Sequence, residues 1–397
     1  MEKQRSVSYI NSILEILIIS TRLGFTSFGG PIAHLGYFHE EYIRRKKWMD
    51  EKSYADLVAL CQFLPGPASS QVGIGIGVMR AGLLGGIVSF IGFTLPSVTV
   101  LILFALMLNR YNIGEAGWIH GLKIVAVVVV AHAILGMGQK LAPDLSRKAI
   151  SLFALAATFL WQTAFTQVVI IVLSALIGLV LFKQNHEKNA VKINFPLSRG
   201  FSIGCLILFI SLLILLPILR ETTSSYWIAM FDSFYRSGSL VFGGGHVVLP
   251  LLEREFVPTG WISEESFLAG YGAAQAVPGP LFTFAAYIGA VMNGWLGGMI
   301  ATIAIFLPAF LLILGTLPFW DMVRQNPKIK GALMGINAAV VGILIAALYH
   351  PIWTSSILSP IDFVFAAILF SLLVFWKVPP WVIVAAGAIG GWVITLF

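Results

Sequence analysis

Charged residues and cysteines are scarce in this sequence of 397 residues. Only 11% of the residues are charged, whereas an ordinary soluble domain carries roughly 25%. Since 58% are hydrophobic, the chain is expected to reside in a lipid bilayer. The two cysteines, Cys61 and Cys205, lie in separate apolar segments and do not correspond under the internal repeat described below. They are therefore expected to be core residues rather than a disulfide or metal ligands.

Two motifs of soluble enzymes are absent as well. The sequence has no His-Glu-x-x-His metal motif and no Gly-x-x-x-x-Gly-Lys-Ser/Thr phosphate loop. We therefore expect no enzyme activity, no cofactor and no metal. The net charge of +7 is concentrated in loops, which indicates membrane topology rather than nucleic-acid binding. The first apolar run contains Glu15 and Arg22 and lacks a small-residue cleavage site, so a signal peptide is not expected.

The apolar runs are long and do not alternate with polar residues, as the stretch 124–135 illustrates. Strands of a membrane barrel would alternate, so the pattern predicts helices. The fold class is therefore an all-α polytopic membrane protein with about 13 transmembrane helices, in a range of about 10 to 14. The predicted crossings are 10–30, 54–79, 83–108, 121–139, 147–162, 165–183, 201–219, 226–245, 265–292, 295–318, 332–349, 360–376 and 379–396.

Two motifs occur twice. Phe28-Gly29-Gly30-Pro31 returns 214 positions later as Phe242-Gly243-Gly244-Gly245, and Gln62-Phe63-Leu64-Pro65-Gly66-Pro67 returns 213 positions later as Gln275-Ala276-Val277-Pro278-Gly279-Pro280. A register this long and steady predicts two copies of one unit. The predicted domains are a first transporter repeat at 1–183, a cytoplasmic linker at 184–200, an additional transmembrane helix at 201–225 and a second repeat at 226–397.

The crossing at 201–219 has no counterpart in the first repeat, so it should reverse the direction in which the second repeat enters the membrane. This predicts an inverted repeat, a common plan of secondary transporters. Most basic segments then share one side, which should be the cytoplasm. The loop Arg44-Arg45-Lys46-Lys47 falls on the opposite side in this arrangement, and the Pro-Gly-Pro segments could instead be re-entrant hairpins.

Each Pro-Gly-Pro must break its helix, because proline removes a backbone donor and constrains the residue before it. The half-helix that follows begins with unpaired N–H groups and the positive end of its dipole, which favours an anion. Neutral donors are added in the first copy by Ser69, Ser70, Gln62 and Gln71, and in the second by Gln275 and Thr283. A packing kink is the alternative, but the recurrence with the preceding glutamine favours a site for one multi-oxygen anion.

Arg22 and Arg236 each precede the phenylalanine of the glycine motif by six residues. A membrane-embedded arginine is costly and can bind an oxyanion bidentately, although pairing with Glu15 or Asp232 is the alternative. His246 is a candidate for proton coupling or a structural histidine. The acids after the glycine motifs, among them Glu41 and Glu255, are interpreted as solvated helix caps and interface charges. The predicted substrate-binding residues are Arg22, Gly29, Gly30, Gln62, Pro65, Gly66, Pro67, Ser69, Ser70, Arg236, Gly243, Gly244, Gly245, Gln275, Pro278, Gly279, Pro280 and Thr283.

With these motifs in both halves, the chain resembles the chromate ion transporter family in its long, two-domain form. The resemblance implies a multi-pass protein of the bacterial inner membrane that exports chromate, driven by the membrane potential or a proton gradient, and confers chromate resistance. Sulfate is the related substrate, because both are tetrahedral dianions. The halves differ at Pro31, which becomes Gly245, and at Ser69-Ser70, which become Phe282-Thr283. Alternatives are transport of sulfate or another oxyanion, or an anion channel; a homodimer is a candidate assembly.

Overall fold

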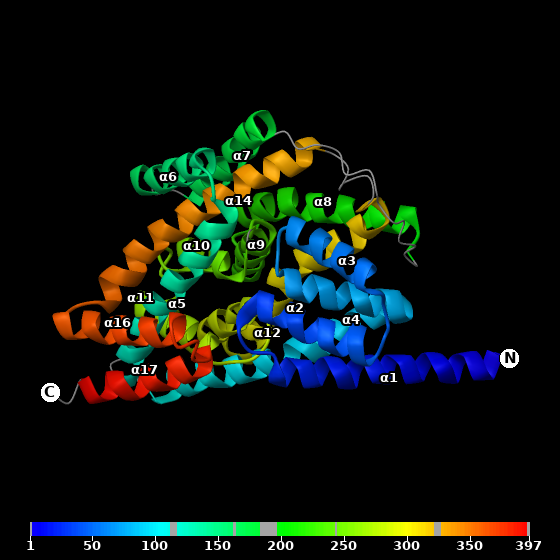
Figure 1. The fold of residues 1–397 in the computed structure, drawn as a ribbon, viewed down its shortest axis with the longest axis horizontal. Helices are drawn as coiled ribbons and strands as arrows, with labels where there is room; N and C mark the ends of the chain where they lie inside the picture. The colour runs from blue at the N-terminus through cyan, green and yellow to red at the C-terminus, as the bar shows by residue number, and fades with distance from the viewer. Residues whose placement is uncertain are drawn as a thin grey trace.

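The computed structural model describes residues 2–111, 117–161, 164–182, 197–242, 244–320 and 327–394. Within these ranges the chain is helical and has no β-strand (Figure 1). The first part contains α1 (Glu2–Thr26), α2 (Gly30–Phe38), the π-helix η1 (His39–Arg45), α3 (Glu51–Phe63), α4 (Ala68–Tyr111), α5 (Gly117–Leu141), α6 (Leu145–Leu160) and α7 (Ala164–Leu181). The second contains α8 (Arg199–Thr223), α9 (Tyr226–Ser239), η2 (Gly245–Val247), α10 (Val248–Phe256), α11 (Glu264–Ala274), η3 (Leu281–Thr283), α12 (Phe284–Thr316), η4 (Leu317–Phe319), α14 (Pro327–Ala347), η5 (Leu348–Trp353), α15 (Thr354–Ser356), α16 (Pro360–Val374) and α17 (Pro380–Ile394).

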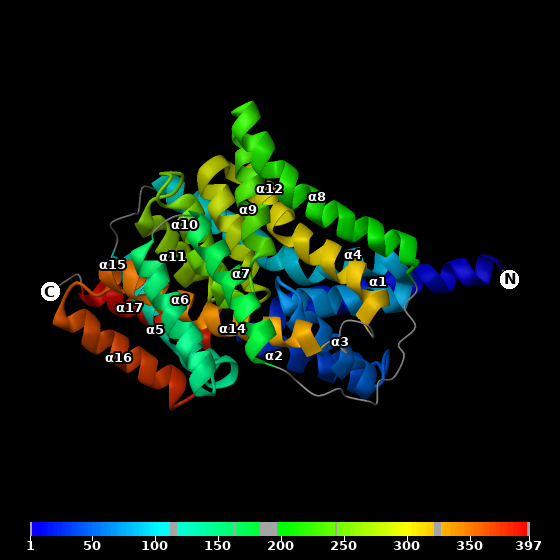
Figure 2. The same cartoon turned by 90° about the horizontal axis from the view of Figure 1, so that it is seen from above.

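Several of these helices are long and apolar enough to cross a bilayer, so the chain is a polytopic membrane protein. The five longest segments are Ala68–Arg110, Gly117–Leu141, Arg199–Thr223, Leu281–Phe319 and Lys328–Ser356, and shorter apolar helices lie at Thr166–Leu181, Pro360–Val374 and Pro380–Ile394. α8 is the most exposed of the long ones, with aliphatic side chains such as Ile207 and Ile214 on its surface. It lies along one edge of the molecule (Figure 2). Such a face fits lipid rather than water.

α4 and α12 each consist of two helical arms joined at a sharp kink. The kink residues are Ala81-Gly82 in α4 and Asn293-Gly294 in α12, with φ of +64° at Gly82 and +59° at Gly294. Each second glycine takes the left-handed conformation that other residues avoid. The two arms fold back on each other and touch at glycines. They are so close that a Cβ at Gly77 would strike the Gly85 carbonyl.

The Pro-Gly-Pro motifs form the tips of two helical hairpins, here called the proline hairpins. The first joins α3 to the first arm of α4, where a Cβ at Gly75 would lie 2.8 Å from Leu57 Cδ1. The second joins α11 to the first arm of α12, where the Tyr287 hydroxyl donates to the Ser266 carbonyl at 2.8 Å. α3 has 13 residues, which gives about 20 Å against a hydrocarbon core of about 30 Å. The predicted segments 54–79 and 265–292 are thus hairpins rather than straight helices.

The glycine motifs form two more tips, here called the glycine hairpins. α1 ends before Gly29, and α2 with η1 turns back along it, so that Lys46 donates to Glu15 at 2.8 Å near the open end. α9 and α10 form the corresponding pair, in which Ser233 donates to Glu255 at 2.9 Å. Gly29 and Gly30 have φ of +95° and +77°, which only glycine adopts readily. The predicted segment 10–30 therefore turns back at its motif.

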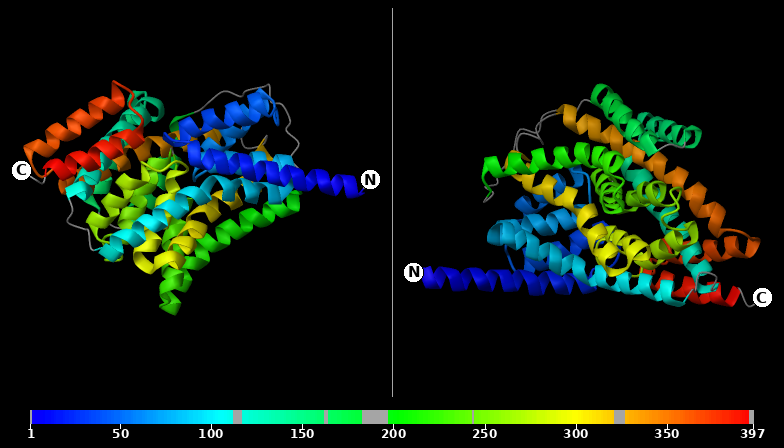
Figure 3. Two further views of the ribbon diagram at one scale, coloured as in Figure 1. Left: turned by 90° about the horizontal axis from the view of Figure 1, so that it is seen from below. Right: turned by 180° about the vertical axis from the view of Figure 1, so that it is seen from behind.

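The remaining helices exchange partners between the halves. α5 packs against α16 and α17, whereas α14 packs against α6 and α7. Close glycine contacts mark both interfaces: a Cβ at Gly121 would strike the Gly387 carbonyl, and one at Gly335 would strike the Ser174 carbonyl. Figure 3 shows α16 and α17 beside α5, far from the N-terminal end of α1. α4 and α12 meet at the centre, so neither half has a separate core.

Candidate anion site at the hairpin tips

The four hairpin tips meet in cross-half pairs. The Gly66 N–H donates to the Val241 carbonyl at 2.7 Å, and the Gly279 N–H donates to the Ser27 carbonyl at 2.9 Å. Gly66 corresponds to Gly279, and Ser27 to Val241, under the repeat register. Each proline hairpin is therefore tied to the glycine hairpin of the other half by the same bond.

Close packing at the tips also joins each proline hairpin to the other half. A Cβ at Gly66 would lie 3.2 Å from Ala309 Cβ, and a Cβ at Gly279 would lie 2.8 Å from Ser97 Oγ. Their φ angles are +112° and +103°, so only glycine fits both the conformation and the space. Pro65, Pro67, Pro278 and Pro280 flank these glycines and hold the bends. A Cβ at Gly245 would lie 3.5 Å from Pro31 Cγ, and these two positions correspond under the repeat register, so the two glycine motifs contact each other at equivalent positions.

Polar side chains are buried around the first-half tips. Ser27, His34, Ser70 and Thr94 are each at most 2% exposed. Their Oγ, Nε2, Oγ and Oγ1 atoms have no hydrogen-bond partner among the described residues. The His34 Nδ1 atom lies 3.2 Å from Ser69 Oγ, at the start of the first arm of α4. Buried polar groups without partners are uncommon and call for a ligand, water or movement to explain them.

The predicted glutamines and the Thr283 hydroxyl differ from one another in burial and hydrogen bonding. Gln62 is exposed on α3, outside this buried cluster. Gln71, expected from the sequence to add a neutral donor, donates from Nε2 to the Pro65 carbonyl at 3.0 Å and braces the first tip. Gln275 Nε2 is buried without a partner in the described part of the chain. Thr283 is buried and donates to the Pro280 carbonyl at 2.7 Å, so its proton is already used.

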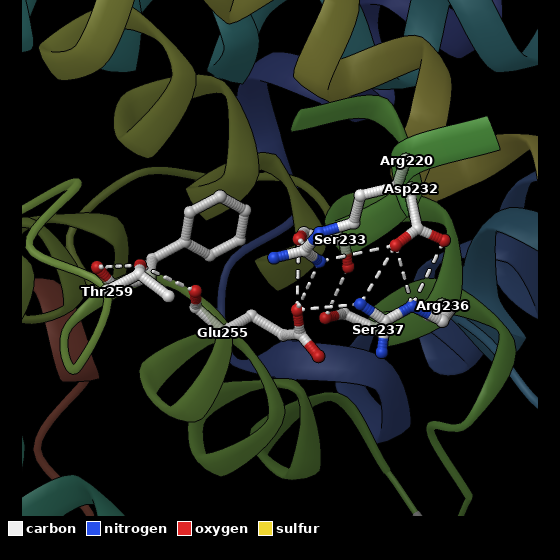
Figure 4. A network of polar contacts seen from close by, with 8 residues as sticks. Arg220, Asp232, Ser233, Arg236, Ser237, Glu255 and Thr259 are labelled. Atoms are coloured by element: carbon white, nitrogen blue, oxygen red, sulfur yellow. Dashed lines mark hydrogen bonds and ion pairs between the residues drawn. The ribbon is translucent and has the colours of Figure 1, made fainter. Parts of the chain in front are cut away.

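Both predicted arginines are held in ion pairs. Arg22 pairs with Glu41, which is buried, while the Arg22 side chain is 52% exposed. Arg236 Nη2 lies 2.9 Å from Asp232 and 2.9 Å from Glu255. Arg220 from α8 joins this second cluster through Ser233, Asp232 and Glu255 (Figure 4). The second cluster thus contains two guanidinium groups and two carboxylates.

The sequence left open that each arginine pairs with a carboxylate instead of binding an anion, and the structure shows such pairs. Asp232 is a partner of Arg236, whereas Glu15 pairs with Lys46 and Arg80 instead of Arg22. Glu41 and Glu255, interpreted as loop charges, are the main acids of the two clusters. Glu41 and Glu255 are 214 positions apart, and so are Arg22 and Arg236. This shared offset was the sequence signal that could have predicted the two ion pairs.

Three further predicted positions flank the tips. The Nδ1 atom of His246 lies 2.9 Å from the Tyr271 hydroxyl. Gly244 has a φ of +146°, as its place in the glycine motif requires. Gly243 lies outside the described residues. A separate pocket of about 360 Å³ lies between α6, α10 and α14, lined by residues that include Gln167, Glu253, Arg254 and His350. It contains none of the motif residues.

Metal coordination has no support in the described ranges, where no group of three or more His, Cys, Asp or Glu side chains is close enough to hold an ion. Cys61 and Cys205 are both free and buried. The chemistry available at the tips is therefore that of neutral hydrogen-bond donors and helix ends.

Comparison with known proteins gives a consistent result. The family described as Chromate transporter matches residues 14–179 and 228–392, so it matches both halves. A chromate transport protein of Pseudomonas aeruginosa is 25% identical over 81% of this chain and 77% of its own. A probable chromate transport protein of Synechococcus elongatus is 28% identical over 82% of this chain and 81% of its own. An uncharacterized transporter of Bacillus subtilis is 33% identical and matches 42% of this chain over 97% of its own length. No solved structure matches.

Proposed function

This chain belongs to the chromate transporter family, and we propose that it is a secondary active transporter that exports chromate across the bacterial inner membrane and confers chromate resistance. The observation that carries the proposal is the family match to both halves, supported by relatives whose names specify chromate transport. Sulfate is the competing substrate, since it is also a tetrahedral dianion.

The proposed membrane arrangement is an inverted repeat of the two halves, 1–183 and 226–397, joined by the linker 184–200 and the segment 201–225. In each half two hairpins enter from one side and stop near the middle, and four helices cross completely: the second arm of α4 with α5, α6 and α7, and the second arm of α12 with α14, α16 and α17. Since four is even, each half begins and ends on the same side. α8 adds a single crossing, so the second half starts from the opposite side. This makes nine full crossings, fewer than the 13 expected, because four predicted crossings are hairpin segments.

The distribution of basic residues supports this arrangement. With the glycine hairpin returning to its side of entry, Arg44-Arg45-Lys46-Lys47 joins the N-terminus, Lys140, Arg147-Lys148, the linker, Lys328-Lys330 and Lys377 on one side. That side is the cytoplasm by the positive-inside rule. The loop that conflicted with the thirteen-crossing topology thereby agrees with the others. Glu253, Glu255, Glu264 and Glu265 fall at the other side, where acids are not disfavoured.

The tips supply the proposed substrate path. Hairpins from the cytoplasmic side meet hairpins from the external side at the Gly66–Val241 and Gly279–Ser27 bonds. These contacts close the centre from both sides, so an anion can enter only when one set of tips separates. Rocking of one half against the other would open each side in turn, as alternating access requires. His246, beside Tyr271, is our candidate for coupling this movement to protons.

Transport of labelled chromate into inside-out membrane vesicles tests the proposal. We expect accumulation when the membrane is energised, loss of accumulation with an uncoupler, and competition by excess sulfate. Vesicles from cells that lack the protein are the control. A channel would let chromate equilibrate without accumulating it. If neither chromate nor sulfate accumulates in energised vesicles, the proposed function is wrong.

Two finer parts of the proposal have separate tests. For proton coupling, His246→Gln should abolish the proton dependence of transport while Tyr271→Phe should only weaken it; equal proton dependence in the wild type and His246→Gln would exclude this role. For the homodimer, the measurement is the mass of transporter protein in each nanodisc, after the lipid and scaffold are subtracted. One chain has a mass of 43.2 kDa, and we expect twice that mass.

A further inference from the structure

The two halves differ in chemistry at the tips, although their backbones correspond. The buried polar residues Ser27, His34, Ser69, Thr94 and Ser97 belong to the first half. In the repeat register their second-half counterparts are Val241, Val248, Phe282, Phe306 and Ala309, which are nonpolar. The only nearby hydroxyl that both halves keep is Ser70, which corresponds to Thr283.

Packing in the second half shows what the nonpolar residues do there. Phe282 and Phe306 contact each other, with ring centroids 5.9 Å apart, and both are almost completely buried. Their first-half counterparts are Ser69 and Thr94, so the pseudo-symmetry brings a serine and a threonine to the place that two phenyl rings fill in the other half. The place that Ser69 and Thr94 occupy in the first half is therefore filled by packed rings in the second, whose remaining polar groups near the tips include His246 and Gln275.

The first-half groups also contact one another and the opposite tip. The His34 ring lies 5.4 Å from the Phe93 ring, edge to face, and Phe93 precedes Thr94. Ser97 Oγ donates to the Thr94 carbonyl at 2.9 Å and contacts the second proline tip at Gly279. The Ser27 carbonyl accepts the hydrogen bond from the Gly279 N–H of that tip. The Ser27 hydroxyl is a separate group and has no partner in the described ranges.

We propose that the transporter has one oxyanion site, formed only by the first half, in which Ser27, His34, Ser69, Ser70 and Thr94 bind a tetrahedral dianion through neutral donors. The site rests on the proposed function and gives it a location. The second proline tip closes over it, and the second-half counterparts of these ligands, except Thr283, are nonpolar. Neither Arg22 nor Arg236 belongs to it, because both are occupied by carboxylates.

Neutral donors suit a transported dianion. The first arm of α4 begins at Ala68, so its free N–H groups and positive dipole end lie beside Ser69 and Ser70. Such an arrangement stabilises an anion without a fixed positive charge that would retain it. Each hydrogen bond from a hydroxyl to a charged ligand raises the affinity for that ligand by about tenfold to a hundredfold.

The test is binding of labelled chromate and sulfate to the purified full-length protein in nanodiscs. Thr94→Val removes the hydroxyl with little change in shape, and Thr94→Ser keeps it. Ser70→Ala provides a second site variant. Ser174→Ala and Ser356→Ala are the matched controls, because both hydroxyls are also buried without a partner among the described residues but lie on α7 and α15.

We expect Thr94→Val and Ser70→Ala each to weaken binding by about tenfold or more. Thr94→Ser and both controls should bind within about twofold of the wild type. If the wild type binds and both site variants bind equally well, the location is wrong although the proposed function stands. If the controls lose binding as strongly as the site variants, the effect is general and the location is also wrong. If the wild type binds neither anion, the proposed function itself fails.

Discussion

At the residue scale, the fold depends on positions where a side chain cannot be added. Gly279 combines a φ of +103° with a contact that leaves no room for a Cβ. Gly66 repeats this in the first half. The buried carboxylate of Glu41 depends on Arg22 and Arg45, which both pair with it, since a buried charge without a partner is strongly unfavourable.

Gly279→Ala should destabilise the protein by about 1–3 kcal/mol, because alanine resists the left-handed conformation and its Cβ would press on Ser97. Gly36→Ala is the control, since no atom lies within 4 Å of a Cβ there. Thermal unfolding in detergent measures both. Equal melting temperatures for the two variants would contradict the strained tip.

Arg22→Gln should lower stability by about 1–3 kcal/mol, because the buried Glu41 carboxylate loses its nearer arginine and keeps only Arg45 Nη1 at 3.5 Å. Adding Glu41→Gln should restore most of the loss, since the buried charge is then removed. A double-mutant cycle of melting temperatures and chromate transport checks this. If the double variant is stable but binds no chromate, Arg22 contacts the anion and our assignment to a structural pair is incorrect.

At the element scale, the hairpins are the unit that the sequence predicted least well. The prolines predicted the two Pro-Gly-Pro breaks, whereas the turns at the glycine motifs were not predicted. Their local pattern could not say whether the chain crosses or turns back, because both alternatives have the same apolar residues around the break. The decisive contacts, such as Gly75 with Leu57 and Lys46 with Glu15, join residues far apart in sequence.

Gly77→Val should prevent the first arm of α4 from folding against the second, because the Gly77 position faces the Gly85 carbonyl. We expect loss of correctly folded protein, seen as aggregation in size-exclusion chromatography. Gly138→Val on α5 is the control, since a Cβ there meets no atom within 4 Å. A monodisperse, transport-active Gly77→Val protein would argue against the hairpin.

At the scale of the whole molecule, the sequence register identified equivalent positions. Gly121 corresponds to Gly335, and each makes a close interhelical contact, with the Gly387 and Ser174 carbonyls respectively. The exchange of partners between halves was not predictable, because a repeat register shows which residues correspond but not which ones touch. Of the proposed anion site, Ser69 and Ser70 came from the motif, whereas Ser27, His34 and Thr94 have no sequence signal of their own.

Arg44→Cys and Thr259→Cys should react with a membrane-impermeant maleimide from opposite sides. Both positions are exposed near the open ends of the glycine hairpins, Arg44 in η1 and Thr259 after α10, and the proposed inverted arrangement puts the first in the cytoplasm. Labelling of intact spheroplasts and of inside-out vesicles distinguishes the sides, in a background with Cys61→Ala and Cys205→Ala. Labelling of both cysteines from the same side would contradict the inverted repeat.

Residues 1–183 and 197–397, produced as two chains in one cell, should assemble and transport chromate. The reason is that α5 binds α16 and α17, and α14 binds α6 and α7, without needing a covalent link. Co-purification of one chain with a tag on the other measures assembly. Either chain alone should be unstable, since its interhelical glycine faces would lack partners; a stable, monodisperse single half would contradict the exchanged packing.

α8 has a consequence for how the two halves could diverge. A protein of one repeat that formed the same tip contacts would need two identical copies inserted in opposite directions, and any change would appear in both copies. In the proposed arrangement α8 fixes the direction of the second half, so a substitution in one half no longer alters the other. The covalent helix would then permit one half to specialise in ligand contact and the other in packing.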